Sequence, residues 1–236
     1  MSVATFALIA GTVLIAAFVQ GSTGLGFALI STPVIGLTQP ELLPVAVLVL
    51  MIPLNLYIAG RERGKVDLGG VGWVSAGRIV GTVGGLAVLA AVPTESLSVL
   101  VGGCIVLAAL ASLFAPSFSP GRSALVSVGA VTGVTETATG VGGPPLALVY
   151  QHKPAPVLRS TIALCFLIGE VVSVLLLLVT GAAQPEQFVT AALLVPALAV
   201  GALMSRYVHH RLEGPRMRNA VLTFALIFGI ALLAGL

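Results

Sequence analysis

Residues 136–145 read ETATGVGGPP, a glutamate followed by small residues and then by a turn rich in glycine and proline. Glycine and proline interrupt helices, so this stretch predicts that one helix ends near residue 138 and that another begins near residue 143. The residues on both sides of it are almost wholly apolar. The fold must therefore provide an environment for the Glu136 carboxylate beside a broken helix within an apolar chain.

The composition answers that question in outline. Of the 236 residues, 58% are hydrophobic and only 8% are charged, and the mean hydropathy is +1.13. Soluble proteins carry roughly 25% charged residues, so this chain cannot cover a surface that faces water. Apolar runs such as residues 1–19 and 220–236 approach the roughly 20 residues that span a bilayer as a helix, whereas barrel strands would alternate polar and apolar residues. The sequence therefore predicts an all-α integral membrane protein.

Proline, glycine and charged residues divide the chain into about ten predicted segments. These segments are residues 3–20, 24–37, 41–60, 69–92, 97–115, 123–138, 143–151, 157–180, 187–208 and 217–236. Segments 24–37 and 143–151 are too short to cross roughly 30 Å of hydrocarbon at about 1.5 Å per residue. Each follows a glycine-rich break, so each is predicted to be the second arm of a hairpin whose tip stays within the membrane.

An internal repeat relates the two breaks. A shift of 116 residues superimposes Gln20 on Glu136, Thr23 on Thr139, Gly24 on Gly140, Gly26 on Gly142 and Pro40 on Pro156. A shift of 120 residues superimposes Gly81 on Gly201 and Leu97 on Met217. The order and the nearly constant offset of these matches predict an N-terminal transmembrane repeat over 1–116, a linker over 117–122 and a C-terminal transmembrane repeat over 123–236.

The positions of the basic residues predict how the repeats lie in the membrane. Basic residues cluster within 61–65, at 122, within 152–159 and within 206–218, whereas 38–40, 93–96 and 181–186 carry no lysine or arginine. If each segment reverses the chain direction, every basic cluster falls on one face, which is the positive-inside pattern of a multi-pass protein of the bacterial cytoplasmic membrane. Five segments per half make the repeats inverted. Four spans per half would give parallel repeats and scatter the positive charge over both faces, so that arrangement is rejected.

Inverted repeats bring the two glycine-rich hairpins in from opposite faces, so that they meet near the midplane. Broken helices are tolerated at that depth only where their freed backbone groups are buried in protein or line a wet cavity. Paired interrupted helices are typical of the central site of a secondary transporter, and the free N–H groups where half-helices begin attract anions. The alternative is that these small residues only permit close packing of helices.

The two breaks also resemble a known family. GSTGLGFALISTP at 21–33 and TGVGGPPLALV at 139–149 are similar to the paired glycine-rich signature of the TauE/SafE (TSUP) sulfite exporter family, over essentially the whole chain. The usual GxGGGxxxxP form is altered here, with Leu25, Phe27 and Ala28 in the first copy and Pro144 directly after Gly143 in the second. The resemblance implies transport of sulfite, sulfoacetate or a related organosulfonate, coupled to the proton gradient.

The candidate substrate-binding residues surround both breaks. They are Gln20, Ser22, Thr23, Gly24, Gly26, Thr137, Thr139, Gly140, Gly142 and Gly143, together with Arg78. Hydroxyl groups and the N–H groups that follow the glycines would donate hydrogen bonds to the oxygens of a small oxyanion. Pro144 and Pro145 have no N–H, so the second break offers fewer backbone donors than the first.

Arg78, Glu136 and Glu170 lie inside predicted membrane segments, where an uncompensated charge is costly. Glu136 and Glu170 are candidate proton-coupling groups, because burial favours the neutral form of a carboxyl group. Glu136 could instead be a neutral acid that hydrogen-bonds a neighbouring helix, and Glu170 could instead neutralise Arg78. Arg78 either pairs with a glutamate, binds the substrate anion, or extends to the cytoplasmic face.

Other classes of protein and site are excluded or less favoured. The sequence has no HExxH or GxSxG motif and no histidine in a predicted membrane segment, so no enzyme is predicted. Cys104 and Cys165 form no metal-binding motif, and we expect no metal and no cofactor. The basic stretch 206–218 indicates contact with anionic lipid and not with nucleic acid. A channel, or a carrier for another small anion or solute, remains the alternative, and the oligomeric state stays open.

Overall fold

The computed structural model describes residues 1–62, 65–93, 96–114, 120–151, 153–212 and 215–235, and the side chains of 208–218 lie outside this description. Residues 63–64 and 152, within two of the predicted basic clusters, also lie outside it, as do 94–95 and 117–119. The described chain contains helices and no strand. The α-helices are α1 (Val3–Thr23), α2 (Phe27–Thr38), α3 (Val45–Arg61), α4 (Leu68–Ala91), α5 (Leu97–Phe114), α6 (Arg122–Thr139), α7 (Gly143–Tyr150), α8 (Ala155–Val179), α9 (Pro185–Leu212) and α10 (Pro215–Ala234), and a short 3-10 helix, η1, covers Pro40–Leu42.

The helix boundaries confirm the predicted all-α membrane class. Five helices of the described chain are long and apolar enough to cross a bilayer: Val3–Thr23, Leu68–Ala91, Leu97–Phe114, Ala155–Val179 and Pro185–Tyr207. The chain is thus a multi-pass membrane protein. The two segments predicted to be short are the 12-residue α2 and the 8-residue α7. Helix α6 begins at Arg122, so the last residue of the predicted linker belongs to this helix.

The two helix breaks share one backbone turn. Helix α1 ends at Gly24, with φ 87° and ψ −2°, and α6 ends at Gly140, with φ 81° and ψ −1°. Both glycines adopt the left-handed conformation that terminates helices. Their N–H groups donate to the carbonyl oxygens of Gln20 and Glu136, each at 2.7 Å. Gln20 and Glu136, and likewise Gly24 and Gly140, therefore occupy equivalent places in equivalent turns. Gly26 and Gly142 differ, with φ 117° and φ −134°.

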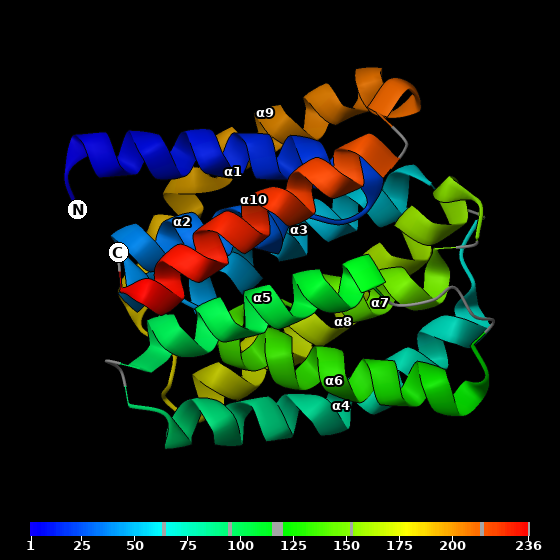
Figure 1. Ribbon diagram of the computed structural model, residues 1–236, viewed down its shortest axis with the longest axis horizontal. Helices are drawn as coiled ribbons and strands as arrows, with labels where there is room; N and C mark the ends of the chain where they lie inside the picture. Colours follow the sequence, from blue (N-terminus) through cyan, green and yellow to red (C-terminus); the bar gives the residue numbers. More distant parts are fainter. Residues whose placement is uncertain (63–64, 94–95, 115–119, 152, 213–214, 236) are drawn as a thin grey trace.

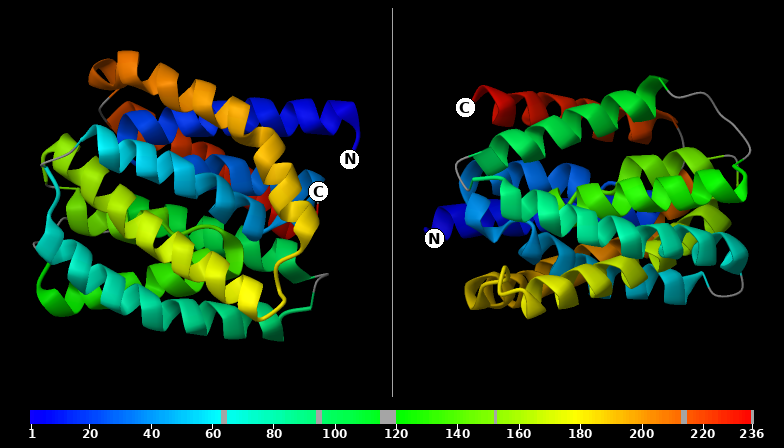
Figure 2. Two further views of the ribbon diagram at one scale, coloured as in Figure 1. Left: turned by 180° about the vertical axis from the view of Figure 1, so that it is seen from behind. Right: turned by 90° about the horizontal axis from the view of Figure 1, so that it is seen from below.

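Helices from one predicted half pack mainly against helices of the other. Helix α1 lies along α9, α4 lies along α6, α3 packs on α8, and α5 packs on α10 (Figures 1 and 2). Helix α1 runs away from the end of the molecule that holds the N-terminus, whereas α6 runs toward that end (Figure 1). The two halves therefore form one interleaved bundle.

Glycines allow the closest of these contacts, between α4 and α6. A Cβ atom at Gly77 or Gly81 would overlap the carbonyl oxygen of Val126 or Ala130, respectively. From the other side, a Cβ atom at Gly129 would overlap the carbonyl oxygen of Val74. Such spacing of small residues lets helix backbones approach directly, which is how helices associate in membranes without a hydrophobic driving force between them.

The connections between helices are sorted between the two ends of the bundle. The termini and the α2–α3, α4–α5 and α8–α9 connections lie at one end (left in Figure 1). The end of α3, the start of α6, the α7–α8 connection and the end of α9 lie at the other. The sequence stretches that carry most of the basic residues thus gather at one end, which we call the basic end.

Candidate functional site

The two helix breaks meet inside the bundle. A Cβ atom built on Gly143, at the start of α7, would lie 3.3 Å from Cδ2 of Leu25 in the first break. A Cβ atom on Gly142 would lie 2.9 Å from Cβ of Glu136, so the second break folds back on its own carboxylate residue. Gly24 packs on Arg159 at the start of α8, where an added Cβ atom would lie 3.0 Å from the Arg159 Cα atom.

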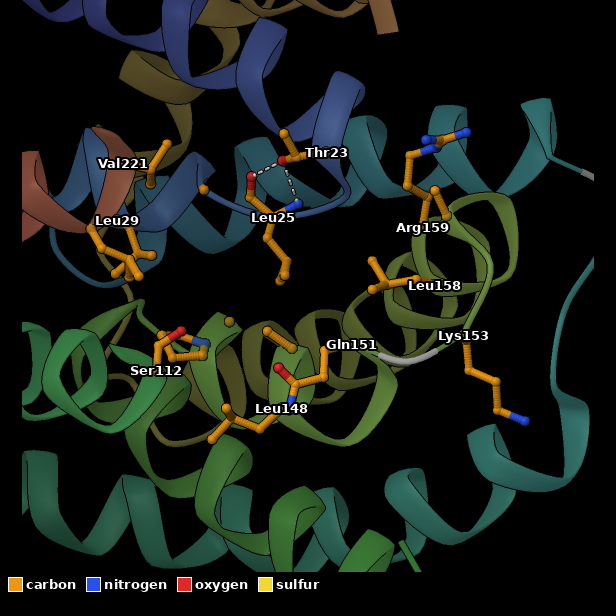
Figure 3. Close-up of a pocket in the computed structure, with 16 residues that line it drawn as sticks. Thr23, Leu25, Leu29, Ser112, Leu148, Gln151, Lys153, Leu158, Arg159 and Val221 are labelled. Atoms are coloured by element: carbon orange, nitrogen blue, oxygen red, sulfur yellow. Dashed lines mark hydrogen bonds between the residues drawn. The ribbon is translucent and has the colours of Figure 1, made fainter. Parts of the chain in front are cut away.

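A cavity of about 290 Å³ lies where the breaks meet (Figure 3). Thr23 and Gly26 line it from the first break and Gly143 lines it from the second. The polar groups Gln151 and Lys153 line it from the α7–α8 connection, at the basic end, Arg159 lines it from the start of α8, and Ser112 lines it from α5. The remaining wall is largely apolar and includes Leu25, Leu29, Ala147, Leu148, Leu158, Val221 and Leu222.

An ion pair joins the predicted halves beside the second break. The guanidinium Nη2 of Arg78, on α4, contacts the carboxylate Oε2 of Glu136, on α6, and these side chains are 1% and 0% exposed. The guanidinium carbon lies 5.4 Å from the centre of the Phe166 ring. The Arg78 guanidinium lies directly against Gly169, where the Cβ atom of any other residue would overlap it. Of the alternatives for Arg78, the structure has the pair with a glutamate and not extension to the cytoplasmic face.

A chain of side-chain hydrogen bonds connects the first break to Glu170. The Phe27 N–H, at the start of α2, donates to Gln20 Oε1 at 3.0 Å. Gln20 Nε2 donates to Asn55 Oδ1 at 2.9 Å, and Asn55 Nδ2 donates to Glu170 Oε1 at 2.7 Å. Arg78 also interacts electrostatically with Glu170. Gln20, Asn55, Glu170, Arg78 and Glu136 thus form one buried polar cluster, drawn from five helices, which we call the charge cluster.

Most of the hydroxyl groups that the sequence places at the breaks donate to their own helices. Ser22 donates to the Phe18 carbonyl oxygen at 2.8 Å, and Thr139 donates to that of Thr135 at 2.7 Å. Thr23 bonds the backbone of Leu25 (Figure 3). Thr137 Oγ1 lies 2.8 Å from Ser173 Oγ. A substrate would therefore compete with existing hydrogen bonds for these groups.

A second set of ionic contacts ties the first break to the basic end. Arg159 donates from Nε and Nη2 to Glu62 Oε1, at 3.1 and 2.9 Å. Arg61 donates to the Gly21 carbonyl oxygen at 2.6 Å and to Ser205 Oγ at 3.1 Å. Helices α1, α3, α8 and α9 are therefore linked just beside the cavity.

The predicted site residues fall into three groups. Thr23, Gly26 and Gly143 line the cavity. Gln20, Arg78, Glu136 and Glu170 belong to the charge cluster. Ser22, Gly24, Thr137, Thr139, Gly140 and Gly142 form or brace the two turns.

Sequence reasoning missed the central place of Asn55 and the apolar cavity wall. The candidate site residues named from the sequence do not include Asn55. An amide at membrane depth is itself a signal, because it must find a partner there. The leucines and alanines of the cavity wall carry no such signal, since they are the commonest residues of any membrane helix.

A family model described as sulfite exporter TauE/SafE matches residues 9–232. Searches among curated proteins and among solved structures gave no match. Among the residues that the structure describes, no group of three or more histidine, cysteine, aspartate or glutamate side chains could hold a metal ion.

Proposed function

Because the chain belongs to the TauE/SafE sulfite exporter family, which is a family of membrane transporters and not of enzymes, we propose that it carries a small sulfur-containing anion across the cytoplasmic membrane. The transported anion is sulfite, sulfoacetate or a related organosulfonate, and its movement is coupled to protons. The observation that carries this proposal is the meeting of the two helix breaks at one cavity beside a buried charge cluster.

We also propose that residues 1–116 and 123–236 are inverted repeats related by an axis in the membrane plane. The equivalent turns at Gly24 and Gly140 support this arrangement, as do the opposite directions of α1 and α6. The packing of α1 on α9 and of α4 on α6 adds support, because an exchange of the two halves converts one contact into the other. In transporters built this way, movement of one repeat against the other exposes the central site to each side in turn.

The cavity has the groups that an entering anion requires. The helices α2 and α7 begin at its wall, and the partial positive charge at helix starts favours anions. Lys153 lies at the wall toward the basic end, where its charge would raise the local concentration of anions. The first break offers backbone donors, whereas Pro144 and Pro145 remove two donors from the second.

We propose proton coupling because the charge cluster contains buried carboxyl groups. A transporter that moves an anion with protons needs a titratable group near the substrate, and buried carboxyl groups at membrane depth are such groups. Glu136 and Glu170 are both fully buried and both interact with Arg78. Arg78 Nε and Nη1 have no hydrogen-bond partner among the described residues, so the predicted contact of Arg78 with substrate stays part of the proposal.

The test is ligand-induced thermal stabilisation of the purified protein. Sulfite, thiosulfate, sulfoacetate, taurine and acetate are compared, and we expect one sulfur oxyanion to raise the melting temperature most. Gly143→Val places methyl groups against Leu25 at the cavity wall and should abolish that increase. Gly103→Val, on α5, is the matched control, because a Cβ atom there meets its nearest neighbour only at 4.0 Å. No stabilisation by any sulfur anion, or equal stabilisation by acetate, would contradict the proposal.

A further inference from the structure

The charge cluster contains one cation and two carboxyl groups, all fully or almost fully buried. Arg78 is 1% exposed, and Glu136 and Glu170 are 0% exposed. With both carboxylates ionised, these three groups sum to one negative charge, and with one carboxylate protonated they sum to zero. A net charge at membrane depth is costly, so the neutral form with one bound proton is the stable resting form. One of the two glutamates must hold that proton.

The contacts of the two glutamates differ. Glu136 Oε2 is in direct ionic contact with Arg78 Nη2. Glu170 has no ion pair among the described residues and accepts one hydrogen bond, from Asn55 at Oε1. Glu136 Oε1 and Glu170 Oε2 both lack a hydrogen-bond partner there, so the two groups differ in the ion pair alone. A carboxylate in direct contact with a guanidinium keeps its charge, whereas a buried carboxyl group without an ion pair is the natural place for a proton. This asymmetry assigns the proton to Glu170.

The groups that face Glu170 from the surrounding helices allow this assignment. Helix α3 presents Asn55, α4 presents Arg78, and α6 presents Glu136 in contact with Arg78. On α8 itself, the thiol of Cys165 interacts with Arg78. Tyr150, on α7, interacts with Cys165 and with Asp67 instead. Arg78 is thus the only cation that acts on Glu170 within the described part of the cluster.

The hydrogen-bond chain leads from Glu170 to the first break, and all of its amide donors point toward Glu170. Each amide donates toward the carboxylate: Asn55 donates to Glu170, and Gln20 donates to Asn55. At the far end, Gln20 Oε1 accepts from the Phe27 N–H, one of the donors at the start of α2. An ionised Glu170 strengthens this chain and keeps the Phe27 N–H bound to Gln20, because hydrogen bonds to charged groups are the stronger ones. A protonated Glu170 weakens it and makes that donor available to an anion.

We propose that Glu170 is the group that binds and releases the coupled proton, that Glu136 remains paired with Arg78, and that Asn55 and Gln20 transmit the charge of Glu170 to the first break. The inference rests on the proposed transport of an anion and deepens it. One proton enters from water on one side and leaves to water on the other, while the Arg78–Glu136 pair keeps its charges. Asn55 and Gln20 act as positioning residues, since they carry no proton themselves.

Infrared difference spectroscopy of the full chain between mildly acidic and mildly alkaline buffer tests the assignment without any anion. The wild-type protein should show the C=O stretching band of a buried protonated carboxyl group, and this band should disappear at the higher pH. Glu170→Gln should remove the band and leave the melting temperature within a few degrees of wild type, because Arg78 and Glu136 stay paired. Glu41→Gln, at a carboxyl group in an exposed position, should change neither quantity.

Glu136→Gln breaks the ion pair and should lower the melting temperature by much more than Glu170→Gln. A band that survives in Glu170→Gln overturns the assignment, as does the reverse order of the two melting temperatures. If Glu170→Gln does not fold, Glu170→Asp decides the matter, because aspartic and glutamic acid carboxyl groups absorb at different frequencies. The band should then move, and an unmoved band overturns the assignment.

The relay from Glu170 through Asn55 and Gln20 to the first break is tested by measuring how the stabilisation by sulfoacetate depends on pH. In wild type, the stabilisation by sulfoacetate should grow severalfold as the pH falls. Asn55→Leu should keep the infrared band but lose most of that pH dependence, and an unchanged dependence would refute the relay. If sulfoacetate and the other sulfur anions do not bind wild type at all, the proposed function fails, while the infrared measurement still decides the role of Glu170.

Discussion

The first and second helix breaks have the same backbone turn but differ in the side chain that occupies the same place in it. In each, the N–H of a left-handed glycine bonds the carbonyl oxygen four residues earlier, at 2.7 Å. That earlier residue is Gln20 in the first break and Glu136 in the second. Gln20 uses its amide to hold the Phe27 N–H of its own hairpin, whereas Glu136 pairs with Arg78 from the other half of the chain.

In the proposed transporter, this difference gives two equivalent turns two different roles. A neutral amide can both accept and donate, so the first break is linked to the hydrogen-bond chain that ends at Glu170. A carboxylate needs a counter-charge, so the second break is held by an ion pair. In the proposed transporter, the first break is therefore the side that would supply donors to the anion, and the second is the side that holds charge.

The largest effect should come from removing the counter-charge of the second break. Arg78→Ala leaves two buried carboxyl groups without a cation, and loss of one partner of a buried pair costs about 3–5 kcal/mol. We expect a strong decrease in melting temperature and in yield of folded protein. Arg122→Ala, at an exposed arginine that stacks on Trp73, is the control and should have little effect. A folded, stable Arg78→Ala protein would show that the pair does not hold the second break.

A smaller effect is expected where α4 supports the second break. Gly81→Ala directs a methyl group into the carbonyl oxygen of Ala130 on α6, and overpacking of this kind costs roughly 1–3 kcal/mol. Gly72→Ala lies on the same helix and meets nothing within 4 Å, so it should be neutral or slightly stabilising. Thermal unfolding of both variants measures the difference, and equal melting temperatures would mean that α4 and α6 are not in backbone contact.

The two left-handed glycines allow a direct comparison of the turns. Alanine at either position adopts an unfavourable conformation that costs roughly 1–2 kcal/mol. At Gly24 the new methyl group also meets the Arg159 side chain and Cα atom, at 2.8 and 3.0 Å, whereas at Gly140 its nearest neighbour is Val47 at 3.4 Å. Gly24→Ala should therefore lower the melting temperature more than Gly140→Ala does. The opposite order would contradict the packing of the first break on α8.

The smallest effect concerns the threonines that brace each turn. Thr23 Oγ1 accepts from the Leu25 N–H at 3.2 Å, and Thr139 Oγ1 accepts from the Val141 N–H at 3.3 Å. Removing one such hydrogen bond costs about 0.5–1.5 kcal/mol. Thr23→Val and Thr139→Val should each reduce the melting temperature slightly and by similar amounts, and serine at either position should restore it. A large loss at one position alone would show that the turns are not equivalent.

Local signals were sufficient to predict the segments and the two breaks. Glycines at 24 and 140 and prolines at 144 and 145 fall where helices end and begin, so the predicted boundaries lie within a few residues of those observed. The repeat offset also predicted the equivalence of Gly24 with Gly140 and of Gln20 with Glu136 in the turns. These features depend on backbone chemistry that each residue carries with it.

The partners inside the bundle could not be predicted in the same way. Arg78 could have paired with either glutamate, and the choice of Glu136 depends on the close approach of α4 and α6, which glycines on both helices make possible. The link from Gln20 through Asn55 to Glu170 joins three helices whose mutual rotation no local pattern fixes. The cavity wall depends on shape, and apolar residues specify shape only collectively.

Flux of sulfite and sulfoacetate into vesicles that contain the purified protein, with and without an imposed pH gradient, is the direct test of proton-coupled anion transport. We expect flux that the gradient accelerates, that Gly143→Val blocks and that Gly103→Val leaves unchanged. Absence of flux for every sulfur anion, or flux of the same rate with and without the gradient, would contradict a proton-coupled anion carrier built on two meeting helix breaks.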